Sequence, residues 1–160
     1  MHTPYLTFHF QGAWYAVEAS WVREILRLPA LTPVSEAPHY IVAIVNYRGH
    51  ILQVMELGLR LGQFPWSYQI RDHVIVLEQE SRPLGMIANE VHAVHEIALE
   101  TPETRTAFAE PPERGSRSIR YLAKLGTTAI MIIDHDRLLN TAAEPRADVK
   151  QAALTVPDVR

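Results

Sequence analysis

Residues 37–62 read APHYIVAIVNYRGHILQVMELGLRLG, in which two apolar runs, residues 41–45 and 51–54, flank the polar segment 46–49. This pattern predicts two strands joined by a tight turn, where Gly49 takes a positive φ that other residues resist. The turn is expected to present an asparagine, a tyrosine and an arginine side by side, with no nucleophile or set of metal ligands around them. Such a corner favours docking to another protein over catalysis.

Short apolar runs recur through the rest of the chain. Hairpins are predicted for residues 5–10 with 14–17, 72–78 with 83–88, and 119–125 with 129–134, and a single strand for residues 91–97. Short helices are expected at residues 19–26 (running into a strand), at 57–61 with a cap at Gly62, near 103–108, and from Asp136, the expected cap, through Leu139. About ten short strands with few helices are typical of sandwiches and barrels, so the predicted class is all-β.

From Thr141 onward the chain is rich in alanine, proline and charge, and it has no strong apolar period. We therefore expect one domain in residues 1–140, followed by a flexible or weakly helical tail in residues 141–160. Trp14 and Trp21 are predicted to pack in the core. Trp66, between a proline and a serine, is assigned equally to the core or to an interface, because tryptophan is enriched at binding hot spots.

Composition excludes several classes of function. The 160 residues are 48% hydrophobic and 21% charged, and the net charge of -3 argues against nucleic-acid binding. The absence of cysteine excludes disulfides and thiolate metal sites. The first residues lack the basic region and apolar core of a signal peptide, and no apolar run approaches the roughly 20 residues of a membrane helix. We expect a cytoplasmic protein without direct membrane insertion.

The sequence also lacks recognisable catalytic motifs. It has no nucleophile elbow, no phosphate-binding glycine loop and no zinc-protease motif. His92 and His95 are three apart on a predicted strand and are expected on opposite faces, so they do not predict a metal site. We expect no catalytic residue, no cofactor and no metal. A small β-barrel enzyme or ligand-binding protein with a polar pocket remains the alternative, and a structural subunit without a signalling role is a third reading.

A series of short segments is spread over residues 5–140. In the first half these are Tyr15-Ala16-Val17, Val22-Arg23-Glu24-Ile25, Ala37-Pro38-His39-Tyr40-Ile41 and Asn46-Tyr47-Arg48-Gly49-His50-Ile51-Leu52. In the second half they are Val74-Ile75-Val76, Leu84-Gly85-Met86-Ile87, and residues 130–134 leading to Leu138-Leu139. In this order the segments resemble the CheW family of bacterial chemotaxis coupling proteins. The Asn-x-Arg-Gly corner is the most specific part of the resemblance.

The resemblance implies two intertwined five-stranded SH3-like β-barrels around a shared core, with short accessory helices. It also implies a non-enzymatic adaptor in chemosensory signal transduction. Its expected partners are the cytoplasmic tip of a methyl-accepting chemoreceptor and the regulatory domain of a CheA-type histidine kinase.

The resemblance also implies protein-binding residues. Arg48 is expected to bond to Glu24 and order the docking corner, which Asn46 and Gly49 shape; the alternative is a solvated turn arginine. Four aliphatic residues correspond to a groove between the barrels that holds a receptor helix, and core packing is the equal alternative for each. They are Val22, Ile51, Val91 and Val94.

Five positions depart from the family's usual residues. They are Ala43 for glycine, Tyr47 for leucine, Gln53 for proline, and Glu56 and Asn89 for aspartate. These departures suggest a divergent member whose pathway differs from flagellar chemotaxis, such as one governing pili or gliding.

Overall fold

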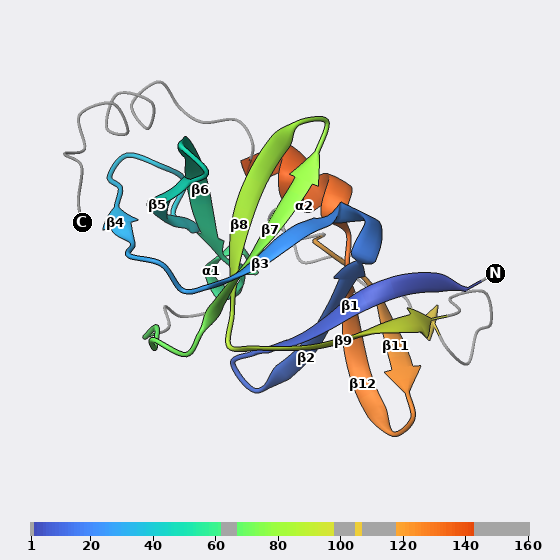
Figure 1. Ribbon diagram of the computed structural model, residues 1–160. Helices are drawn as coiled ribbons and strands as arrows, with labels where there is room; N and C mark the ends of the chain where they lie inside the picture. Colours follow the sequence, from blue (N-terminus) through green and yellow to red (C-terminus); the bar gives the residue numbers. More distant parts are fainter. Residues whose placement is uncertain (1, 62–66, 98–104, 107–117, 143–160) are drawn as a thin grey trace.

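The computed structural model describes residues 2–61, 67–97, 105–106 and 118–142, which form two twisted six-stranded β-sheets (Figure 1). The terminal sheet has the strand order β10-β11-β12-β2-β1-β9. Its strands are β1 (Thr3–Phe10), β2 (Ala13–Glu18), β9 (Glu90–Ile97), β10 (Arg105–Thr106), β11 (Ile119–Leu125) and β12 (Thr128–Ile133). The central sheet has the order β3-β7-β8-β6-β5-β4. Its strands are β3 (Val22–Arg27), β4 (Thr32–Pro33), β5 (Ile41–Tyr47), β6 (His50–Glu56), β7 (His73–Gln79) and β8 (Arg82–Ala88).

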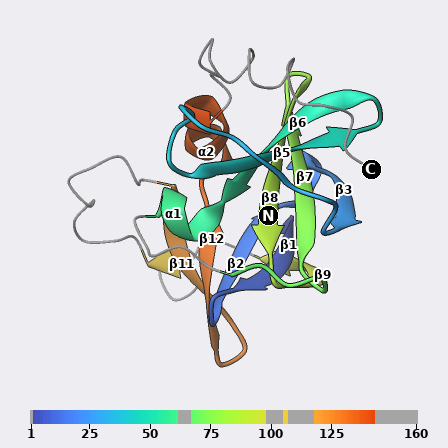
Figure 2. The same ribbon diagram turned by 90° about the vertical axis from the view of Figure 1, so that its left-hand side faces the viewer.

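The all-β prediction is confirmed. Each sheet has five longer strands and one strand of two residues, which agrees with the expected pair of five-stranded SH3-like barrels. The four predicted hairpins are present as β1–β2, β5–β6, β7–β8 and β11–β12. Strands β3 to β8 form the central sheet, while the terminal sheet combines strands from before and after them, so the two lobes are intertwined (Figure 2).

One main hydrophobic core joins the two sheets. Phe8 and Tyr15 of the terminal sheet and Leu52 and Met86 of the central sheet are buried in it together. Full burial of such side chains stabilises the fold by about 1.5–3 kcal/mol each, far more than exposed ion pairs contribute. The opposite face of the terminal sheet covers a second, smaller core that includes Ile130. The expectation of a shared core is therefore confirmed.

The helices are short: η1 (Ala19–Trp21, a 3-10 turn), α1 (Leu57–Arg60) and α2 (His135–Ala142). Helix α2 follows the terminal sheet but buries Leu138 in the main core. Among the residues that the structure describes, no helix is both long enough and apolar enough to span a membrane.

The expected short helix running into a strand at 19–26 is present as Ala19–Trp21 followed by β3. The helical part is shorter than its apolar pattern suggested, because the residues of β3 alternate between half-buried and exposed and so follow a strand period. Two other local predictions were wrong. Within 103–108, Arg105–Thr106 form a strand against β11 instead of a helical turn. Asp134, not Asp136, caps α2, since its Oδ1 accepts the backbone N–H of Arg137 at 3.3 Å.

Some predictions fall on residues outside the described part of the chain. These are the helix cap at Gly62, the assignment of Trp66 and the tail after residue 142. The described part of the predicted tail, Thr141 and Ala142, belongs to α2.

Candidate protein-binding site

The turn between β5 and β6 forms the predicted corner. Arg48 and Gly49 have φ values of 52° and 79°, so both central residues of this two-residue turn are left-handed. The sequence predicted a positive φ at Gly49 only. The Oδ1 atom of Asn46 accepts the backbone N–H of Gly49 at 2.9 Å, which fixes the turn from within. Asn46 and Gly49 thus shape the corner as expected.

Glu24 on β3 anchors the side chain of Arg48. One carboxylate oxygen of Glu24 accepts the Tyr47 hydroxyl at 2.6 Å and the Nη2 of Arg48 at 3.0 Å. The side chain of Arg48 remains 64% exposed, against 31% for Glu24. The predicted pair is therefore present, and it holds an exposed guanidinium in a defined position. We call Glu24, Asn46, Tyr47, Arg48 and Gly49 the arginine corner.

Tyr47 does not extend into solvent, and the expectation of an exposed tyrosine was wrong. Tyr47 is only 6% exposed, because its ring packs in the main core. The guanidinium carbons of Arg48 and Arg23 lie 5.5 and 5.9 Å from the ring centroid. Arg23 also pairs with Glu78 at 2.8 Å. Tyr47 thus supports the arginine corner, because its ring packs in the main core and its hydroxyl donates a hydrogen bond to Glu24.

The bond between Tyr47 and Glu24 affects the protonation of both groups. It is the main reason that the pKa of Glu24 lies below its usual value, and Arg48 and Arg23 lower it further. The same bond raises the pKa of the Tyr47 hydroxyl. At neutral pH the corner therefore carries an ionised carboxylate held between a neutral hydroxyl and a cation.

The four predicted groove residues separate into two pairs. Val22 and Val91 are half-buried and pack against the main core. Ile51 and Val94 are 52% and 56% exposed. Ile51 lies next to the arginine corner, opposite Asn46 in the β5–β6 ladder. Val94 lies on β9, the edge strand of the terminal sheet. Of the four, Ile51 and Val94 offer apolar surface to a partner.

Ile25 is a further accessible residue that the sequence reasoning missed. It follows Glu24 on β3 and is 41% exposed. The signal was present, because Arg23, Ile25 and Arg27 alternate with the half-buried residues of that strand. Assigning this segment to a helix obscured the two-residue period.

The prediction that His92 and His95 lie on opposite faces was wrong. Both line one small hollow of about 100 Å³ beside Trp14. The register between β1 and β9 shifts between Leu6 and Phe8, so a β-bulge adds a residue to β9 between the two histidines. His92 packs on Trp14 with ring centroids 4.2 Å apart. No group of three or more potential metal ligands occurs among the described residues.

The two described tryptophans are half-buried at the rims of the cores. Trp14 packs against the smaller core and Trp21 against the main core. The indole N–H of Trp21 donates to Glu18 at 3.1 Å, and its ring packs against the tilted ring of His135 with centroids 3.9 Å apart. Trp14 and Trp21 thus contribute to packing, although neither is fully enclosed.

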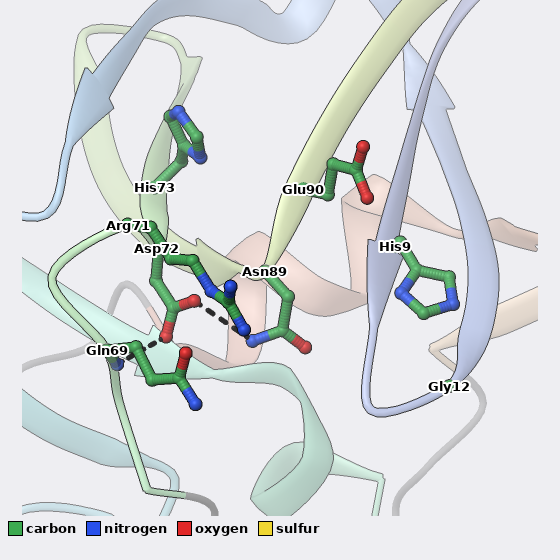
Figure 3. A pocket seen from close by; sticks show the side chains of 8 residues that line it. All are labelled: His9, Gly12, Gln69, Arg71, Asp72, His73, Asn89 and Glu90. Atoms are coloured by element: carbon green, nitrogen blue, oxygen red, sulfur yellow. Dashed lines mark hydrogen bonds between the residues drawn. The ribbon is translucent and has the colours of Figure 1, made fainter.

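A polar hollow of about 600 Å³ opens where the chain leaves β8 and enters β9 (Figure 3). Asn89 is the single residue between these two strands, which belong to different sheets. Apart from Gly12 its lining is polar and consists of His9, Gln69, Arg71, Asp72, His73, Asn89 and Glu90. We call this cavity the junction hollow. A polar pocket is what the alternative ligand-binding reading of the sequence predicted.

Asn89 at the centre of the hollow explains one departure from the family pattern. Its amide group donates to Asp72 Oδ1 at 3.4 Å, and its Oδ1 accepts the backbone N–H of Gln11 at 2.8 Å. An aspartate at this position would place a second carboxylate against Asp72. Asparagine satisfies both neighbours, and its bonds tie the β1–β2 turn to the start of β7.

Glu56, another position that differs from the usual family residue, is also buried. It is 1% exposed and accepts the hydroxyl of Tyr68. Burial and this bond raise the pKa of Tyr68. Ala43 is buried in β5, and Gln53 is half-buried opposite Ile44.

Comparison with known proteins agrees with this fold. The chemotaxis protein CheW of Rhizobium meliloti is 28% identical over 66% of this chain and 70% of its own length. The chemotaxis protein CheW of Klebsiella aerogenes is 25% identical over 86% of this chain and 81% of its own length. The crystal structure of the scaffolding protein TtCheW from Thermoanaerobacter tengcongensis shares the fold with a TM-score of 0.71, at 23% identity over 84% of this chain and 90% of that one. The family model of the CheW-like domain matches residues 4–143, and the chain belongs to this family.

Proposed function

We propose that this protein is a non-enzymatic cytoplasmic adaptor that links the tip of a methyl-accepting chemoreceptor to the regulatory domain of a CheA-type histidine kinase. Membership of the CheW-like family supports the adaptor role, since the curated relatives are named chemotaxis proteins. The observation that carries the proposal for this chain is the arginine corner. It presents an exposed cation on a fixed turn.

The receptor is proposed to bind at the arginine corner. An exposed ion pair contributes at most about 1 kcal/mol to stability, so the pair between Arg48 and Glu24 is better suited to orienting the guanidinium than to holding the fold. Ile51 and Ile25 supply exposed aliphatic surface on the strands that carry the corner. A receptor helix with one apolar face and an acidic residue beside it would match this surface.

The kinase is proposed to bind at the edge of the terminal sheet. Strand β9 is an edge strand, and Val94 is exposed on it, which favours a kinase contact for Val94 over the receptor groove that the family resemblance implied. Main-chain pairing at such an edge gives affinity, while a neighbouring aliphatic side chain adds specificity. Each contact need only be weak, because a clustered array raises the effective concentration of its parts.

The test is a pair of titrations with the full chain. One uses the regulatory domain of a CheA-type kinase from the same genome, and the other uses a soluble receptor-tip fragment. We expect saturable binding in both, and we expect Val94→Glu to weaken kinase binding while leaving receptor binding intact. A folded sample that binds neither fragment would overturn the adaptor proposal.

A further inference from the structure

The junction hollow has a fixed floor whose polar groups are already bonded. Asp72 is 3% exposed, and its two carboxylate oxygens accept the backbone N–H of Gln69 at 2.8 Å and the amide of Asn89 at 3.4 Å. The backbone N–H of Asn89 donates to the carbonyl of His9 at 2.9 Å. These bonds hold residues of both sheets around the cavity. The cavity is therefore a built feature of the junction between the sheets.

The walls of the hollow carry charged groups that lack strong partners. Arg71 makes no hydrogen bond or ion pair within the described part of the chain. The side chain of Glu90 is 65% exposed, and its Oε1 lies 3.5 Å from the Nε2 atom of His92. Figure 3 shows the side chains of Arg71 and Asp72 on one side of the hollow and those of Glu90 and His9 on the other. A cation in the turn before β7 and an anion at the start of β9 thus line a single cavity.

Another polar atom of the lining also lacks a partner. The Nδ1 atom of His73 is buried and has no hydrogen-bond partner among the described residues. Formally the lining holds one arginine and two carboxylates. A purely anionic ligand would meet both Asp72 and Glu90, and a purely cationic one would leave Arg71 unpaired.

We propose that the junction hollow binds a small zwitterion, specifically a free α-amino acid. The guanidinium of Arg71 would take the ligand carboxylate through its two-pronged N–H face. The carboxylate of Glu90, on the opposite side of the hollow, would take the ammonium group. Because the lining has an excess of one negative charge, amino acids with a basic side chain bind more tightly than neutral ones, and acidic ones bind least.

Amino-acid binding at the junction hollow would be independent of the adaptor function and would give that function an input. The ligand would contact residues of both sheets and so stabilise their relative position. The volume of about 600 Å³ lies within the usual range for small-molecule sites, about 300–1,000 Å³, so an amino acid fits with space for water.

The test is calorimetric titration of the full chain with lysine, alanine and glutamate, and with acetate and butylamine as single-charge probes. We expect saturable binding of lysine, weaker binding of alanine and the weakest of glutamate. Arg71→Gln and Glu90→Gln should each weaken lysine binding about tenfold, the usual value of a charged hydrogen bond. Arg82→Gln, an exposed arginine at the other end of the β7–β8 pair, should have no effect.

Several outcomes would overturn the proposal. They are no saturable binding of any amino acid up to about 10 mM, a preference for glutamate over lysine, and acetate or butylamine binding as tightly as lysine. An equal loss in Arg82→Gln would also overturn it. Circular dichroism establishes that each variant is folded, and Arg71→Lys, which keeps the charge but not the fork, replaces Arg71→Gln if that variant unfolds. Kinase and receptor titrations on the same samples separate this result from the adaptor function.

Discussion

Two hairpin turns in the central sheet have nearly the same backbone, yet only one of them presents an anchored side chain. In the β5–β6 turn Arg48 and Gly49 have φ values of 52° and 79°, and in the β7–β8 turn Glu80 and Ser81 have values of 50° and 62°. Arg48 is held by Glu24. Glu80 makes no hydrogen bond or ion pair within the described residues. A left-handed turn therefore does not fix the position of a side chain by itself; at Arg48 the anchor on the neighbouring strand does.

The largest expected difference between the two turns is the stability cost of placing a valine at their second central residue. Gly49→Val places a β-branched residue at a φ of 79° and should lower the free energy of unfolding by about 1–3 kcal/mol. No other atom lies near the new Cβ, so the cost comes from the backbone alone. Urea denaturation measures it. Ser81→Val, at a position already occupied by a non-glycine residue, is the matched control and should cost clearly less; an equal cost would contradict the account.

The next largest effect concerns the hydrogen bond between Asn46 and Gly49 that fixes the β5–β6 turn. Asn46→Ala removes the acceptor for the Gly49 N–H and should lower the free energy of unfolding by about 0.5–1.5 kcal/mol. Denaturant titration checks this value. Because the turn then loses its internal brace, hydrogen exchange at Gly49 should also become faster. Unchanged exchange would show that the strands alone hold the turn.

A glycine in the β7–β8 turn should stabilise the protein. Ser81→Gly relieves a left-handed conformation that L-residues resist, and we expect a gain of roughly 0.5–1 kcal/mol in the free energy of unfolding. Thermal and urea denaturation provide the measurement. Receptor binding should not change, since this turn carries no anchored side chain. A loss of receptor affinity would show that the β7–β8 turn also takes part in docking.

The smallest expected effect is a change in the pKa of Glu24. Tyr47→Phe removes the main cause of the low pKa of Glu24, so this pKa should rise toward the ordinary value of 4.5. A carboxyl whose pKa is lowered by folding contributes stability above its unfolded pKa and loses it as the pH falls through the folded value. The variant should therefore be less sensitive to acid at this site. Carboxyl NMR titration measures the shift, and an unchanged pKa would show that the arginines dominate.

Local sequence patterns predicted the hairpins and the arginine corner well. Apolar runs around a short polar segment were enough for β5 and β6, and the pairing of Arg48 with Glu24 followed from the resemblance to the CheW family. The burial of Tyr47 was not predicted, because its position within the polar segment suggested a turn residue. The strand in fact continues through Tyr47 and turns its ring into the core.

Features that depend on register between distant strands were not predictable in this way. The bulge that places His92 and His95 at one hollow arises from how β9 pairs with β1, more than 80 residues earlier in the chain. The junction hollow joins His9, Arg71 and Glu90, which share no sequence motif. Only the folded arrangement of the two sheets brings these groups together.

The most direct test of the account compares the same substitution near the two turns. Arg48→Glu and Arg82→Glu each reverse one exposed arginine of the central sheet, and the receptor-tip affinity of each variant is measured by titration. If the receptor binds at Arg48, we expect receptor affinity to fall at least about tenfold in Arg48→Glu, or about 1.4 kcal/mol, with kinase binding intact and with Arg82→Glu unchanged. Wild-type receptor affinity in Arg48→Glu, or an equal loss in both variants, would contradict the arginine corner as the receptor site.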